Sequence, residues 1–144
     1  MMHQATHAIY EALKKVDGLK PFTDEVGESS NVWLQFSLEN GGSYRIRFIS
    51  SDEDNDVSVR VFSLISLKGE QRANILPATN FINNKFRFVK FVVDKDGDVN
   101  VEYDFPVRTI DPSACAEEIA IRFVQIIKEA YPILMKAMWG GFQP

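Results

Sequence analysis

Two histidines near the start of the chain, His3 and His7, have the spacing of a metal-binding pair. Residues four positions apart lie on one face of a helix, so the two imidazoles could reach the same ion. Zinc sites take three or four protein ligands, and the sequence places no third ligand nearby. We therefore interpret the pair as part of an ordinary helix face and expect no metal.

Two aspartate-rich runs, "SDEDNDV" and "DKDGD", could supply oxygen ligands for calcium. An EF-hand loop needs glycine at position 6 and a bidentate glutamate at position 12. With Gly97 at position 6, position 12 is Tyr103, and with Asp52 at position 1, position 12 is Ser63. Both runs fail this test, so we interpret them as solvent-exposed turns.

Nucleophiles are present without the groups that would activate them. Ser113 and Cys115 stand near the start of a predicted helix, but no nucleophile elbow or glycine-rich phosphate loop accompanies them. Cys115 is the only cysteine, and its place in a helix predicts a packed thiol. We therefore expect a protein that is not an enzyme, with no catalytic residues and no cofactor.

Length and charge limit the class of protein. A chain of 144 residues is the size of one domain, so residues 1–144 are predicted to form a single domain. No run is long and apolar enough for a membrane span, and the opening segment lacks the apolar run of a signal peptide. We therefore expect a cytoplasmic protein that does not enter a membrane. The net charge of −4 gives no general attraction for nucleic acid, which is not expected as a partner.

The stretch "FVVDKDGDVNVEYDF" is predicted to form a β-hairpin. A three-residue turn over 95–97, with Gly97 in the left-handed conformation, matches apolar to apolar and cation to anion. The predicted pairs are Val93 with Val99, Phe91 with Val101, and Lys90 with Glu102.

Three earlier segments alternate apolar and polar residues, over 32–38, 44–48 and 56–67, and are predicted strands. The loop "NGG" is expected to pair Leu38 with Tyr44.

Three helices complete the pattern, and proline marks two of them. The first is predicted over 3–16 from its apolar spacing. Pro77 is expected in the first turn of a short second helix. The last helix begins after Asp111, and Pro132 predicts a kink or a break near Lys128.

These elements read α-β-β-β-α-β-β-α, which predicts an α+β fold with a five-stranded antiparallel sheet and helices mainly on one face. The segment "NFINNKFRFVKFVVDKDGDVNVEYDFPV" resembles the YbjN family of bacterial proteins, named as sensory transduction regulators. The shared features are an Asn-x-x-Asn helix, here Asn80 and Asn83, an acidic hairpin tip with glycine, and a "YD" return strand ending in proline. The resemblance implies a type III secretion chaperone-like fold, in which homodimers commonly hold an extended segment of another protein. It implies no catalytic residues.

The sheet face opposite the predicted core mixes aromatic side chains with cations, as protein interfaces do. The candidate interface consists of Trp33, Arg45, Arg47, Arg60, Phe62, Leu64, Phe88, Lys90 and, in the C-terminal tail, Trp139. Two other occupants stay open: loops or the last helix of the same chain, and single-stranded nucleic acid.

We therefore expect a non-catalytic interaction domain, a regulator or chaperone-like adaptor that binds a segment of another protein and forms a homodimer. The alternative is a small-ligand sensor with a pocket between the sheet and the C-terminal helix.

Overall fold

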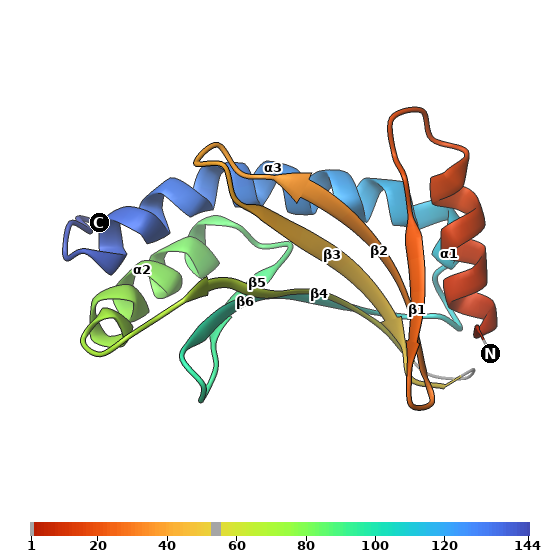
Figure 1. Cartoon of the computed structure of the whole chain (residues 1–144), viewed down its shortest axis with the longest axis horizontal. Helices are drawn as coiled ribbons and strands as arrows, with labels where there is room; N and C mark the ends of the chain where they lie inside the picture. The colour runs from red at the N-terminus through yellow and green to blue at the C-terminus, as the bar shows by residue number, and fades with distance from the viewer. Residues whose placement is uncertain (1, 53–55) are drawn as a thin grey trace. The chain divides into compact units, whose positions relative to one another are not determined.

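The computed structural model describes residues 2–52 and 56–144. Its helices and strands follow in this order (Figure 1): α1 (Gln4–Lys14), β1 (Phe22–Val26), β2 (Ser29–Ser37), β3 (Ser43–Ser50), β4 (Asp56–Ser66), α2 (Gln71–Lys85), β5 (Lys90–Val93), β6 (Asp98–Pro106) and α3 (Pro112–Met138). The predicted α+β class is confirmed. The acidic run over 51–57 cannot be assessed as a whole, because residues 53–55 lie outside the described part.

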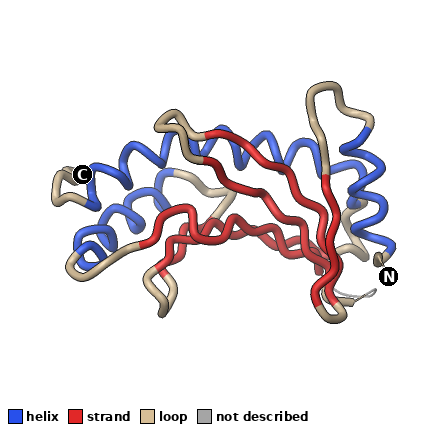
Figure 2. Tube along the Cα trace, in the orientation of Figure 1, coloured by secondary structure: helices blue, strands red, loops and turns tan. Residues whose placement is uncertain are grey.

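The strands, red in Figure 2, form a six-stranded antiparallel sheet in the order β1-β2-β3-β4-β6-β5. The prediction of five strands was wrong because it missed β1. That strand has only five residues, four of them exposed, so it lacks the run of buried apolar side chains that signals a strand in sequence.

By its internal contacts the chain divides into two compact units. Unit 1 comprises Met1–Arg60 and Tyr103–Ile121, and unit 2 comprises Val61–Glu102 and Arg122–Pro144. Strands β4 and β6 and helix α3 each contribute residues to both units. The single domain expected over 1–144 stays a prediction.

In unit 1, α1 packs against β2 and β3 through Ile9 and Leu13, which are fully buried. Buried hydroxyls fix the helix as well, since Thr6 Oγ1 and Ser30 Oγ lie 2.6 Å apart. His3 Nδ1 lies 2.9 Å from Ser50 Oγ, so this imidazole already has a partner on the sheet.

The β2–β3 register differs by two residues from the predicted one. Phe36 pairs with Tyr44, whereas the prediction set Leu38 opposite Tyr44. Leu38 instead donates its N–H to the Gly42 carbonyl at 2.7 Å and closes the loop. Because the shift is an even number, every side chain stays on its predicted face of the sheet.

In unit 2, α2 packs against β5 and begins at Gln71, so the prediction that Pro77 opens the helix was wrong. Proline has no N–H for the Ala73 carbonyl, which costs one helical hydrogen bond. The buried face, formed by Ile75, Ala78, Thr79 and Ile82, runs through the proline and holds the helix together. Helix α3 likewise contains Pro132 without a break.

The β5–β6 hairpin has the predicted register: Val93 pairs with Val99, Phe91 with Val101, and Lys90 with Glu102. The prediction of a three-residue turn is also confirmed. Gly97 has φ +84°, and the Asp94 N–H donates to the Asp98 carbonyl at 2.9 Å. Lys90 Nζ and Glu102 Oε1 lie 3.9 Å apart.

The carboxylate of Asp94 organises this turn. Its Oδ1 accepts from the backbone N–H groups of Asp96 and Asp98 at 2.9 and 3.0 Å. Its Oδ2 accepts from Asn100 Nδ2 at 2.9 Å. The hydrogen bond from the Asp98 backbone, followed by the one from the Asn100 side chain, lowers the pKa of Asp94 below its ordinary value. The acidic tip is therefore bonded to its own chain.

Candidate protein interface

The outer face of unit 1 carries four of the predicted interface residues. Trp33 of β2 lies opposite Arg47 of β3, which in turn lies opposite Arg60 of β4. Arg45 lies opposite Gln35 on the same face. Antiparallel pairing therefore brings Arg45 and Arg47 to one indole ring, with Arg60 on the next strand.

Trp33 contacts an aromatic ring from one neighbouring strand and two cations from the other. Phe22 of β1 stacks on it with a centroid distance of 4.5 Å and an interplanar angle of 19°. On the β3 side, the guanidinium carbons of Arg45 and Arg47 lie 4.0 and 5.7 Å from its centroid. Lys20 Nζ lies 5.4 Å from the Phe22 ring. Such contacts combine stacking with cation–π attraction.

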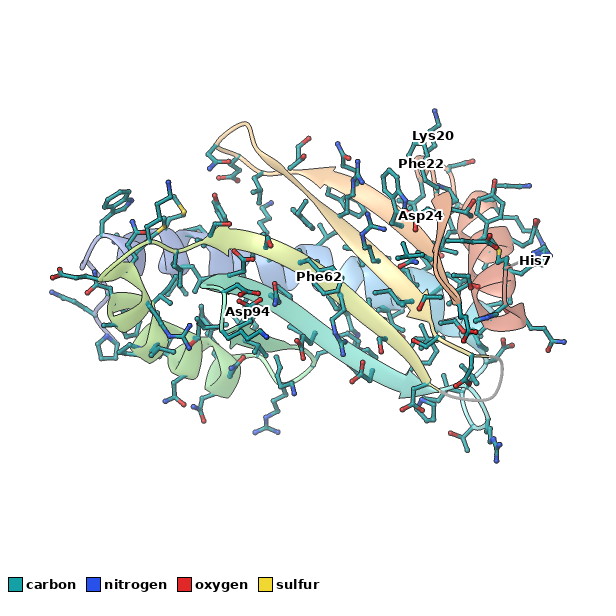
Figure 3. The ribbon with its side chains drawn as sticks, turned by 60° about the horizontal axis from the view of Figure 1, so that its bottom comes forward. His7, Lys20, Phe22, Asp24, Phe62 and Asp94 are labelled. Atoms are coloured by element: carbon teal, nitrogen blue, oxygen red, sulfur yellow. The ribbon has the colours of Figure 1, made fainter. Side chains whose placement is uncertain are left out.

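We name this set the outer cluster; it consists of Lys20, Phe22, Asp24, Trp33, Arg45 and Arg47. Figure 3 shows Phe22 and Asp24 on β1, with Lys20 just before the strand. Lys20, Phe22 and Asp24 were not predicted as site residues, because β1 was not recognised. A weak local signal could have indicated them: Gly27 is a turn residue, and it separates Phe22–Val26 from the apolar alternation of β2.

The cations of this face differ in how they are paired. Arg47 Nη1 lies 3.1 Å from Asp24 Oδ2, and Arg60 Nη1 lies 2.7 Å from Asp104 Oδ1. Arg45 Nε donates to the neutral Gln35 Oε1 at 3.3 Å. Among the described residues Arg45 has no ion-pair partner, so its charge is available to an anion from outside.

Two buried polar atoms of the outer cluster have no hydrogen-bond partner among the described protein atoms: Asp24 Oδ1 and Trp33 Nε1. Each such atom typically costs about 1–3 kcal/mol of stability. One atom is an acceptor and the other a donor, and both belong to the same cluster. An unpaired acceptor and an unpaired donor thus lie in the same cluster as Arg45 and Arg47.

The predicted residues of unit 2 do not form a comparable cluster. Phe62 is exposed on β4, but Ser63 beside it has φ +53° and interrupts the alternation of faces. The side chain of Asn100 holds this conformation, because its Oδ1 accepts from the Ser63 N–H at 2.8 Å. Leu64 is consequently only 7% exposed and has little surface for a partner.

The remaining predicted residues of unit 2 lie on other elements than Phe62 and have other contacts. Phe88 precedes β5, and the guanidinium carbon of Arg122 on α3 lies 4.9 Å from its ring centroid. Lys90 is paired with Glu102, as described above. Trp139 follows α3 and is 74% exposed. Phe142, three residues further along the chain, instead packs against α2: its ring centroid lies 5.6 Å from that of Phe81.

Unit 2 also has a pocket of about 420 Å³ between α2 and the C-terminal segment. Its lining consists of Ala73, Asn74, Pro77, Ala137, Gly140, Phe142 and Pro144. None of these side chains carries a charge, so the pocket has hardly any groups to orient a polar ligand.

Cys115 has the setting of a structural thiol. Burial, the largest cause, raises its pKa, and Asp111 and Glu118 raise it further. Its Sγ lies 3.6 Å from the Pro112 carbonyl oxygen. Over residues 2–52 and 56–144, no three His, Cys, Asp or Glu side chains are grouped so as to hold a metal ion.

The described chain thus combines an antiparallel α+β fold with an aromatic and cationic patch on one face of the sheet. The profile of the family "Putative bacterial sensory transduction regulator", YbjN, matches residues 36–130, and the chain belongs to this family. The matched residues include the Asn80–Asn83 motif and the acidic hairpin, so the predicted family is confirmed. Comparisons with curated proteins and with solved structures gave no match. In the described part of the chain, no helix has the length and apolar character needed to cross a membrane.

Proposed function

We propose that this chain is a non-catalytic regulator or adaptor that binds an acidic segment of a partner protein on the outer face of unit 1. Arg45 carries the proposal. It is an exposed cation held against Trp33, with no anion of the described chain paired to it. A carboxylate from a partner would complete this ion pair beside an aromatic surface, the combination typical of binding hot spots.

Neighbouring groups support this assignment. Phe22 remains 39% exposed although it stacks on Trp33, so it offers apolar contact area next to Arg45. Arg47 is held by Asp24 and Arg60 by Asp104, which leaves them to position the face and to add positive potential. Since Arg45 and Phe22 already pack against the indole, Trp33 is less available as a platform for stacking nucleic-acid bases.

The proposal includes the finer expectations that come with the resemblance. These are a type III secretion chaperone-like fold, a homodimer in the cytoplasm, and no catalytic activity. The family description of a regulator is compatible with an adaptor of this kind. Small-ligand sensing is the alternative function.

The test begins with native mass spectrometry of the tagged protein recovered gently from its source cells. A second polypeptide in the spectrum provides the partner for measurement of dissociation constants by calorimetry. Arg45→Glu is expected to weaken its binding at least tenfold, because a carboxylate would then face a carboxylate. Arg87→Glu is the matched control, with the same charge change at an exposed position of unit 2.

Equal binding of the partner by Arg45→Glu and Arg87→Glu would contradict the proposed surface. A bare chain carrying a reproducible small added mass would instead favour the small-ligand sensor. Circular dichroism of each variant shows whether it is folded.

A further inference from the structure

The side of β1 that faces away from β2 is an open sheet edge. In the sheet formed by the described residues, β1 has β2 as its only neighbouring strand. Thr23 and Glu25 are exposed, and Phe22–Val26 contains neither a proline nor a residue with positive φ. Edge strands present N–H and C=O groups that can pair with another chain.

The β1–β2 turn determines which backbone groups point outward. Gly27, with φ +59°, and Glu28 form a two-residue turn, and Val26 pairs with Ser29. In such hairpins the pair flanking the turn is hydrogen-bonded, and bonded pairs then alternate along the strands. The backbone of Thr23 therefore points away from β2, and so does that of Glu25.

The side chains of the alternate residues Phe22, Asp24 and Val26 share the outer face of β1. An added strand would meet them in non-hydrogen-bonded pairs, where facing side chains come closest. Phe22 is 39% and Val26 70% exposed, and the Asp24 side chain is 40% exposed although it pairs with Arg47. The strand thus presents an apolar, an acidic and an apolar group in sequence.

We propose that β1 binds an extended segment of a partner protein as an added strand, and that this segment has a basic side chain between two apolar ones at alternate positions. The apolar groups would cover Phe22 and Val26, and the cation would face Asp24. Glu25 and Glu28 add negative charge to the same hairpin. Phe22 borders both surfaces, but the outward backbone of Thr23 serves this proposal alone and the charge of Arg45 serves the proposed function alone, so Thr23→Pro and Arg45→Glu test the two proposals separately.

A second copy of β1 fits this edge poorly. Antiparallel self-pairing that matches Phe22 with Val26 sets Asp24 against Asp24 of the other copy. A shift by two residues sets Asp24 against Phe22 or Val26. The first register is disfavoured by two like charges, and the shifted registers by a carboxylate that faces an apolar side chain. A basic segment of another protein is therefore the better occupant.

The probe is a synthetic seven-residue peptide, TLTKTVT, in which leucine, lysine and valine alternate with threonine. We expect it to bind the full chain and to slow amide hydrogen exchange at Thr23 at least tenfold, because the outward N–H gains an acceptor. A peptide with glutamate in place of lysine is expected to bind at least tenfold more weakly.

Thr23→Pro removes the outward N–H and is expected to abolish peptide binding, whereas Thr23→Val, with the N–H intact, is expected to retain it. Arg87→Glu, the same kind of charge change at an exposed position of unit 2, is expected to bind this peptide as the wild type does. The proposal is overturned if the lysine peptide does not bind at millimolar concentration. It is overturned as well if binding leaves exchange at Thr23 unchanged, or if Thr23 becomes protected by self-association without peptide.

Discussion

The two edge strands of the sheet differ in how their outward backbone groups are satisfied. At β5, in unit 2, Asn83 Nδ2 donates to the Phe91 carbonyl at 2.9 Å, and the Phe91 N–H donates to Asn83 Oδ1 at 2.7 Å. The amide thus pairs with β5 as a neighbouring strand would. At β1, in unit 1, no described side chain forms such hydrogen bonds with the outward N–H and C=O of Thr23.

The difference follows from the element that precedes each strand. Helix α2 leads into β5 and packs against it, which brings Asn83 to the strand edge. Strand β1 follows α1, which packs against β2 and β3 instead. Native proteins commonly block edges that would otherwise pair with other chains. An edge closed by a side-chain amide contributes to stability, while an edge left open is suited to binding.

Of the two edge strands, the family model matches only the closed one. The closed edge, with Asn83 and β5, lies within residues 36–130. Strand β1 lies before the matched segment. The acidic hairpin that carries β5 is therefore part of the family pattern, whereas the open edge is a feature of this chain outside it.

The largest effect is expected from opening the closed edge. Asn83→Ala would leave the N–H and C=O of Phe91 unpaired on a strand where that residue is only 3% exposed. The free energy of unfolding in urea should fall by about 2–4 kcal/mol. Asn84→Ala is the control, because that amide donates to the Asn80 carbonyl of its own helix and not to the strand; its effect should stay within about 0.5 kcal/mol. Equal losses in the two variants would show that Asn83 does not close the edge.

A smaller and pH-dependent effect is expected at the hairpin tip beside the closed edge. Its native hydrogen bonds lower the pKa of Asp94, so the ionised carboxylate stabilises the fold above the unfolded-state pKa. This stabilisation is lost as the pH falls through the lower native pKa. The gap in unfolding free energy between wild type and Asp94→Asn should therefore be largest above about pH 4 and narrow below it.

Asp96→Asn serves as the control for the hairpin tip, since Asp96 contributes its backbone N–H rather than its carboxylate. Its difference from the wild type should show no comparable narrowing. A gap for Asp94→Asn that stays constant from neutral pH down to pH 2 would contradict the assigned role of the charge.

The smallest effect is expected from proline at the open edge. The Thr23 N–H points away from β2, so Thr23→Pro removes no hydrogen bond of the sheet. The free energy of unfolding should change by less than about 1 kcal/mol. A loss near the roughly 3 kcal/mol typical of proline at a bonded position would show that this N–H is used within the chain.

The local periodicity of the sequence was sufficient to predict most of the fold. The β5–β6 hairpin was predicted with its turn and register, because only one loop length matches apolar residues and opposite charges across the strands. The β2–β3 register was predicted two residues off, since the glycine-rich loop allows more than one closure. Pro77 was misplaced because burial of Ile75 and Ile82 outweighs its cost to the helix.

For the candidate site, alternation along β2 and β3 is enough to place Trp33, Arg45 and Arg47 on one face of the sheet. It could not reveal Phe22, which stacks on Trp33 from a strand too short and polar to be recognised. It also misplaced Leu64, because the positive φ of Ser63 depends on Asn100, which is far away in the sequence.

The sequence by itself determined the α+β class, the family and the face of the sheet on which most cations lie, because these depend on spacing between near neighbours. The tertiary structure decided which cation lacks a counter-ion and which sheet edge is closed. Asp24 reaches Arg47, and Asn83 reaches Phe91, only when separate elements have packed together. Such pairings depend on distances in space that residue spacing along the chain does not encode.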